Sequence, residues 1–280
     1  MEFFPFTKLL ESLIRWAHVM FAILWVGNSF LFNYLDYKLE KNKKNKEIGG
    51  EKMLIHSGSY YYFAKYKGVP KKLFTELIVF KYQSYLTFLT GVLLLILIYY
   101  SNAGILMVDK KVMDITPQTA VIISVLSVIL VWLIYDNICK SKLKNYKIIF
   151  NLLLIVLAVV TAYISTKIFS KSYSYLHFGI VCGSVMFFNV FFRIIPNQKQ
   201  LAVLNKKGKY DLNLSIDAKN RSIMNNLLTY ITLWVMLSGH MSYLRMHQYN
   251  WIILLVIFIV SLGVRHYFNL RAQNKIKSLL

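Results

Sequence analysis

Seven runs of about twenty mostly apolar residues recur along this 280-residue chain, and no other feature limits its fold as strongly. A helix needs about 20 apolar residues to cross the hydrocarbon of a bilayer. Backbone groups in lipid must bond within their own helix or barrel, and no strand-like alternation indicates a barrel. We therefore predict an all-α transmembrane bundle that forms one integral-membrane domain over residues 1–280, with spans at about 12–35, 82–100, 119–138, 148–168, 173–195, 227–243 and 250–268.

The charges of the connections indicate how this bundle is oriented. The chain has a formal net charge of +21, and 26 of its 33 Lys and Arg residues lie on one set of alternating connections. Cytoplasmic loops of membrane proteins carry such an excess, so the charge does not indicate a nucleic-acid partner. We predict a multi-pass protein in a lipid bilayer, with its amino terminus outside and its carboxyl terminus in the cytoplasm.

Three histidines fall at one predicted level of the bilayer, near the outer ends of three different spans: His18, His177 and His240. Each lies roughly 5–9 Å below the outer surface at 1.5 Å per residue. Neutral imidazole is a good ligand for haem iron, and ionisable residues in spans tend to be functional. Two interpretations remain open: two of these histidines bind a haem b iron, or each is an interfacial residue bonded to a carbonyl or water.

The inner ends of the first, fifth, sixth and seventh spans are rich in amides, imidazole and guanidinium. We assign substrate binding to the amides Asn28, Asn197, Gln198, Asn225 and Asn226, and a catalytic role to His266. Such groups suit a planar, hydrogen-bonding, anionic heterocycle. The alternative is structural: amides bond between helices, and Asn is also a favoured helix cap.

The connection at residues 39–81 contains the segment "HSGSYYYFAKY", which is unlike the apolar spans around it. We predict that it forms a cytoplasmic lid, with its tyrosines on the membrane surface, where this residue type is enriched. His56 is the candidate for proton transfer because imidazole titrates near neutrality. Ser57 and Lys65 complete the predicted catalytic group, with Lys65 orienting an anion.

Several of these segments together resemble one protein family. "LWVGNSFLFNYLD", "IHSGSYYYFAKY", "NVFFRIIPNQKQ", "AKNRSIMNN" and "RHYFNLR" are similar to the amino-terminal membrane domain of bacterial cytochrome c-type urate oxidases, over nearly the whole chain. The resemblance implies a helical bundle in the bacterial cytoplasmic (inner) membrane. It also implies oxidation of urate in purine catabolism, with electrons passing to a cytochrome c module that follows the bundle.

The chain departs from the family pattern in two ways. The sequence ends at Leu280 without a cytochrome c module, so we expect a separate cytochrome c or a quinone to accept electrons. Expected histidines, tryptophans and an acid are replaced by Ile78, Val79, Tyr82, Gln83 and Met224. We therefore expect an oxidoreductase that oxidises urate or a related small heterocycle. The alternatives are a purine or small-anion transporter and a non-catalytic membrane subunit.

Overall fold

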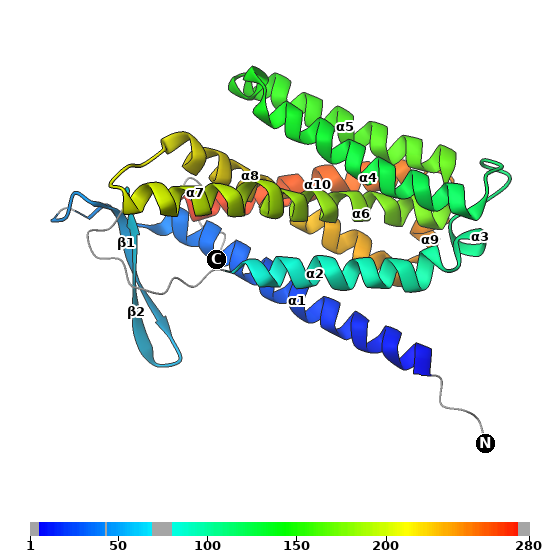
Figure 1. Ribbon diagram of the computed structural model, residues 1–280, viewed down its shortest axis with the longest axis horizontal. Coiled ribbons are helices and arrows are strands. Elements are labelled where there is room, and N and C mark those ends of the chain that lie inside the picture. Colours follow the sequence, from blue (N-terminus) through cyan, green and yellow to red (C-terminus); the bar gives the residue numbers. More distant parts are fainter. Residues whose placement is uncertain (1–5, 43, 69–79, 274–280) are drawn as a thin grey trace.

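Long helices dominate the computed structural model, which describes residues 6–42, 44–68 and 80–273 (Figure 1). The first half of the chain forms α1 (Phe6–Lys38), β1 (Ile48–His56), β2 (Ser59–Tyr66), α2 (Lys81–Leu94), η1 (Leu95–Tyr100), α3 (Ala103–Leu106), α4 (Pro117–Lys140) and η2 (Lys142–Asn145). The second half forms α5 (Lys147–Ile168), α6 (Lys171–Asn189), η3 (Val190–Ile194), α7 (Ile195–Lys206), α8 (Leu212–Leu237), η4 (Ser238–His240), α9 (Ser242–Arg245) and α10 (Asn250–Ala272).

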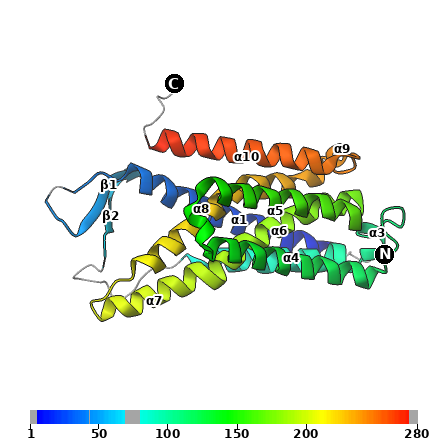
Figure 2. The ribbon, with the colours of Figure 1, turned by 90° about the horizontal axis from the view of Figure 1, so that it is seen from above.

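The long helices run side by side, with α6 and α8 at the centre of the bundle (Figures 1 and 2). Helix α6 contacts α4, α5 and α8, and α8 also contacts α10. Helix α1 packs mainly on α2 and leaves much of its apolar surface uncovered, as a helix facing lipid would. Successive long helices run in alternating directions, so the basic connections lie at one end of the bundle. This end carries the hairpin, α7 and the carboxyl-terminal part of α10.

Six helical stretches within the described residues are long and apolar enough to cross a membrane: Phe6–Lys38, Lys81–Tyr100, Pro117–Lys140, Lys147–Ile168, Lys171–Lys206 and Asn250–Ala272. The predicted span at 227–243 is not among them. This stretch belongs to α8, a 26-residue helix that ends at Leu237, and its first half carries Asp217, Lys219 and Arg221. At 1.5 Å per residue α8 is about 39 Å long, so its length suffices while its polar half lowers its hydropathy.

The all-α class predicted for the bundle is confirmed, and the connection after α1 adds one antiparallel β-hairpin to it. Strands β1 and β2 pair from Glu51↔Ala64 to His56↔Ser59. Ser57 and Gly58 lie between the strands with φ of 50° and 75°. Two positive φ angles in a two-residue loop define the tight turn that matches strand twist, and glycine adopts this conformation without strain. The "HSG" sequence is therefore explained by the turn.

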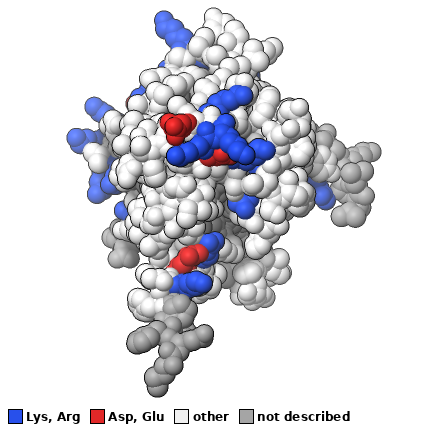
Figure 3. Space-filling model, turned by 90° about the vertical axis from the view of Figure 1, so that its right-hand side faces the viewer, with Lys and Arg blue, Asp and Glu red and all other residues white. Residues whose placement is uncertain are grey.

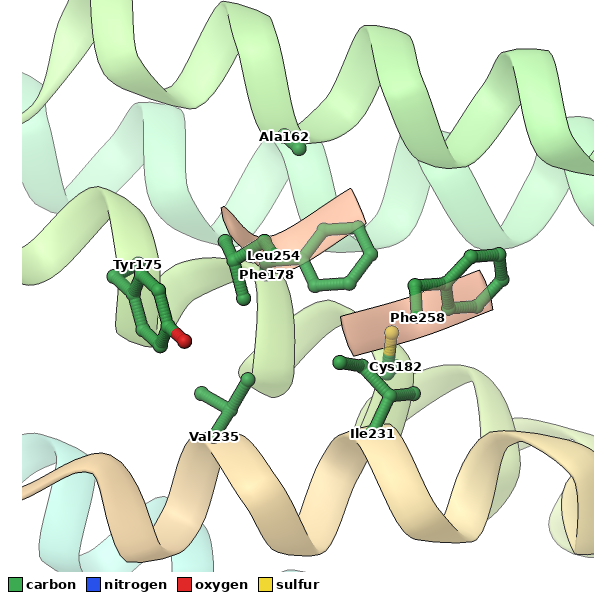
Figure 4. Close-up of a cluster of buried hydrophobic side chains, with 8 residues drawn as sticks. All are labelled: Ala162, Tyr175, Phe178, Cys182, Ile231, Val235, Leu254 and Phe258. Carbon is green, nitrogen blue, oxygen red and sulfur yellow. The ribbon is translucent and has the colours of Figure 1, made fainter. Parts of the chain in front are cut away.

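The centre of the bundle is an apolar cluster to which four long helices contribute (Figure 4). Ala162 of α5 lies near Tyr175, Phe178 and Cys182 of α6, while α8 contributes Ile231 and Val235, and α10 contributes Leu254 and Phe258. Trp234 donates its indole hydrogen to the Tyr175 hydroxyl at 2.8 Å, which satisfies two polar groups at the edge of the cluster. This packing fixes α8 and α10 relative to each other. It therefore also positions the residues of these two helices that lie towards the hairpin end of the bundle.

The end of the bundle that carries α3 and α9 differs from the hairpin end in its charge. Figure 3 views the molecule from this side: much of the visible surface is uncharged, but Lys or Arg lies beside Asp or Glu both near the middle and lower down, and further basic residues lie at the edges. Of the 33 Lys and Arg residues, 26 belong to the other set of connections, which is the asymmetry expected of a protein inserted with its basic end inward.

Candidate functional site

A pocket of about 580 Å³ lies between α1, α8 and α10 at the basic end of the bundle. This volume is in the range of sites that hold small organic ligands. Apart from Ala272, its wall has three kinds of side chain, and none of the described lining residues is acidic. Aromatic rings come from Phe30, Tyr34, Tyr37, Tyr230 and Phe268, cations from Lys38, Arg265 and Arg271, and amides from Asn33 and Asn269.

Arg265 is the most enclosed cation of this pocket, with 7% of its surface exposed. Its Nε donates a hydrogen bond to Oδ1 of Asn226, which is itself buried and donates to Ser29. The guanidinium carbon lies 4.6 Å from the ring centroid of Phe30, and Phe30 stacks on Tyr230 at 5.5 Å. These contacts hold the guanidinium in place before any ligand arrives. A fixed guanidinium beside aromatic faces favours a planar anion, because it combines paired hydrogen bonds with ring stacking.

Helical spacing brings the lining residues to one side of each helix. Phe30, Asn33, Tyr34 and Tyr37 follow the i, i+3, i+4, i+7 pattern on α1, and Arg265, Phe268, Asn269 and Ala272 repeat it on α10. Asn33 donates to Oδ1 of Asn269 at 3.0 Å and so joins the two faces. This repeated pattern is the sequence signal for the pocket, but its aromatic residues are not among the predicted site residues.

A second polar group, which is not among the predicted sites, is buried between α4, η3 and α8. Asp136 is 3% exposed and accepts hydrogen bonds from Arg193 at 2.8 and 2.5 Å and from Arg221 at 2.7 Å. Lys140 pairs with the same carboxylate at 2.7 Å. Arg221 also donates to Asn189 at 3.2 Å. Three cations that converge on one carboxylate connect three separate helical segments, so we interpret this cluster as structural.

The predicted substrate-binding amides separate into different places. Asn28 donates to Gln83 at 2.7 Å and joins α1 to α2, while Asn197 donates to Asp217 at 2.8 Å and joins α7 to α8. Gln198 is exposed on α7. These three do not line the pocket. Asn28 and Asn197 have the interhelical partners that the structural interpretation expects.

Asn225 and Asn226 are adjacent in α8 and face different neighbours. Asn225 accepts from Asn189 at 2.9 Å and donates to the Met186 carbonyl at 2.8 Å, both on α6. Asn226 faces α1 and α10 instead and holds Arg265. Neither caps the helix, since α8 begins at Leu212 with Asp211 as its N-cap. Asn226 therefore does not line the pocket itself, but it positions the Arg265 guanidinium that does.

The predicted catalytic residues do not meet at the pocket. His56 and Ser57 are exposed at the tip of the hairpin, and Lys65 pairs with Asp36 at 2.5 Å. His266 is exposed on α10, while its neighbour Arg265 faces the pocket. No residue of the hairpin lines this pocket, so contacts do not support a lid role for the described part of the 39–81 connection. Residues 69–79 of this connection lie outside the described residues. These catalytic roles stay predictions.

The three histidines of the outer level have three separate sets of neighbours. His18 Nδ1 lies 3.0 Å from both the Thr87 carbonyl and the Thr90 hydroxyl, and the tautomer of the ring decides with which of them it bonds. Gly91 makes room for this ring, since a Cβ there would lie 3.0 Å from its Cε1. His177 is buried, with Ser127 at 2.9 Å from Nε2 and Ser124 at 3.5 Å from Nδ1. His240 is exposed beyond α8, and no group of three potential metal ligands occurs in the part of the chain that the structure describes.

The fold and the pocket together define a class: a helical bundle with six membrane-compatible segments and a basic, aromatic cavity at one end. Within that class the chain belongs to the urate oxidase N-terminal family, whose family model matches residues 5–280. No curated protein and no solved structure matches the chain. Of the positions where the chain departs from the expected family pattern, Gln83 serves as the partner of Asn28 and Met224 packs beside an apolar cluster, whereas Ile78 and Val79 lie outside the described residues.

Proposed function

We propose that this protein is a membrane-embedded oxidoreductase of the urate oxidase type, which binds urate or a related planar anion in the pocket between α1, α8 and α10. The observation that carries the proposal is the fixed Arg265 guanidinium, which Asn226 holds beside the ring of Phe30, and Phe30 in turn stacks on Tyr230. Membership of the urate oxidase N-terminal family supports urate as the first compound to test. The basic end would face the cytoplasm of a bacterial inner membrane, where purine catabolism supplies urate.

The reaction in this proposal removes two electrons and two protons from the bound heterocycle. The electrons pass to an acceptor outside the chain. A quinone takes both electrons and two protons to become a quinol, whereas a separate cytochrome c takes the electrons one at a time and the two protons go to water. The residues of the pocket would bind and orient the ring: Arg265 pairs with its anionic edge, and the aromatic faces stack against its plane.

A haem b on the electron route remains a prediction, and the histidines differ in how well they fit it. Nδ1 of His18 contacts the Thr87 carbonyl and the Thr90 hydroxyl, and a hydrogen bond donated from Nδ1 to that carbonyl would leave Nε2 with the lone pair that a metal ligand needs. Both nitrogens of His177 have serine partners, and His240 is exposed, so neither completes a prepared ligand pair. A reduced-minus-oxidised optical spectrum of the purified protein and of His18→Ala tests whether haem is bound.

Binding and turnover of urate by the protein in lipid nanodiscs test the proposal. We expect Arg265→Gln to weaken urate binding by about 10- to 150-fold, since a hydrogen bond to a charged group contributes about 1.5–3 kcal/mol. Lys219→Gln is the matched control, because it removes a positive charge from the same end outside the pocket. Loss of urate absorbance with a quinone analogue or cytochrome c reports oxidation.

The possible outcomes separate the alternatives. Equal urate binding by Arg265→Gln and the wild-type protein would refute the pocket assignment. Binding without oxidation by either acceptor would favour the non-catalytic membrane subunit. Uptake of labelled urate into sealed vesicles, without product, would favour the transporter.

A further inference from the structure

The hairpin of β1 and β2 projects from the bundle and is attached to it only near its base, as far as the described residues show. Phe63 packs against Phe32 of α1 with ring centroids 5.8 Å apart, and Lys65 pairs with Asp36 at the end of the same helix. Lys52 also bonds to Glu40, just beyond α1. The outer half of the hairpin extends away from all the helices in Figure 1. An isolated two-stranded hairpin is marginally stable in water, so this element needs a surface to rest on.

One face of the outer half is apolar and uncovered. The register pairs Met53 with Tyr62 and Ile55 with Tyr60, and paired residues point to the same face of a hairpin. These four side chains are 56–74% exposed. Two of them are tyrosines, which combine an apolar ring with a polar tip and are enriched where membrane meets water. A patch of this kind on an otherwise detached element is typical of an interaction surface.

The direction of the hairpin indicates that the surface of the bilayer covers its apolar face. The strands leave the chain shortly after the end of α1, which is a candidate membrane span. They run across the direction of the long helices in Figure 1, and Figure 2 agrees, since the hairpin there is seen nearly end-on. If the helices stand along the membrane normal, the hairpin lies along the membrane surface, beside the bundle rather than over it. A soluble partner would not require this orientation.

The charge of the segment fits a lipid surface that is anionic. Residues 38–67 contain eight Lys and three Glu. Two of the glutamates have neutralising or hydrogen-bonding partners in the hairpin, since Glu40 bonds to Lys52 and Glu51 accepts from Tyr62. Clusters of lysine beside a membrane span are attracted to the anionic lipids of the cytoplasmic leaflet. The segment therefore combines an aromatic patch for the interface with positive charge for the headgroups.

We propose that the β1–β2 hairpin is an interfacial anchor that lies on the anionic cytoplasmic leaflet, with Met53, Ile55, Tyr60 and Tyr62 inserted among the headgroups. This anchor fixes the inner end of α1 through Phe63 and Lys65, and α1 forms one wall of the pocket. The inference stands on the hairpin alone and does not depend on the proposed substrate.

Single fluorescent labels on the full-length protein test the anchor. The native thiols, Cys139 and Cys182, are buried and are replaced by Ala, and an environment-sensitive dye is attached to Ile55→Cys or Tyr60→Cys. Lys207→Cys, exposed at the same end after α7, is the aqueous control, and Ile23→Cys, exposed on α1, is the lipid control. Each protein is placed singly in nanodiscs of phosphatidylcholine with or without phosphatidylglycerol, and quenching by spin-labelled lipid and by aqueous iodide is measured.

We expect the labels at positions 55 and 60 to be quenched severalfold more by shallow spin-labelled lipid than the label at 207, and to be shielded from iodide when phosphatidylglycerol is present. Replacing Lys41, Lys44 and Lys46 by Gln should reduce this shielding. Labels at 55 and 60 that behave like the label at 207 would refute the anchor. Shielding that appears only when two copies share a disc, or only when a soluble protein is added, would also refute it by identifying a protein partner.

Discussion

Replacing Asp136 by Asn should destabilise the bundle far more than the same change at Asp36, although both aspartates lie near the basic end and pair with several cations. Asp136 is buried between α4, η3 and α8, and its partners are Arg193, Arg221 and Lys140. Asp36 is partly exposed at the end of α1 and pairs with Lys65 and Lys219. The comparison isolates burial as the cause, because the chemical change is identical.

The size of the effect follows from the exposure of each partner. The side chain of Arg221 is 1% exposed, and removing one member of a buried ion pair costs about 3–5 kcal/mol. Arg193 and Lys140, at 25% and 50%, can turn towards water, so each adds only about 0–1 kcal/mol. Asp217 lies 3.6 Å from Arg221 and offsets part of the loss. We therefore expect about 3–4 kcal/mol for Asp136→Asn and about 0–1 kcal/mol for Asp36→Asn.

Unfolding in mixed micelles of increasing denaturing detergent, followed by circular dichroism, measures both differences. A second substitution tests the reasoning further: adding Arg221→Met to Asp136→Asn removes the stranded buried charge, and should recover most of the lost free energy of unfolding. A loss below about 1 kcal/mol for Asp136→Asn would refute the argument, as would a double variant no more stable than the single one.

Three further predictions concern the hairpin and the α1–α2 contact. Gly58→Val should destabilise the hairpin, because φ of 75° is strained for a β-branched residue; faster amide exchange across 48–66 with an unchanged bundle would confirm it. The hydrogen bond from Lys52 holds the pKa of Glu40 below its usual value, so this contact should persist above the ordinary carboxyl pKa and be lost as pH falls through the lowered one. Amide exchange of β1 corrected for its intrinsic pH dependence measures this, and an identical acid response in Glu40→Gln would contradict it. Gly91→Val should displace His18 and lower stability by about 1–3 kcal/mol, whereas Gly27→Val, with open space around it, should have little effect in the same unfolding assay.

The sequence by itself determined the helical bundle. Runs of about twenty apolar residues have one stable arrangement in lipid, because a helix satisfies its own backbone. The sequence also contains the hairpin turn, since Ser57 and Gly58 separate two strand-forming segments, and the lid role of this segment stays a prediction. It placed the basic connections at one end, and the alternating helices of the structure agree.

Only the tertiary structure decided which of two adjacent polar residues serves the pocket. Arg265 and His266, like Asn225 and Asn226, are about 100° apart around a helix, and composition does not say which direction faces a neighbour. The structure turns Arg265 towards α1 and leaves His266 exposed. Asp136 meets Arg193 and Arg221 from 57 and 85 residues away, and no local pattern encodes such pairs. The burial of a charge, and therefore its energetic weight, depends on which helices pack around it.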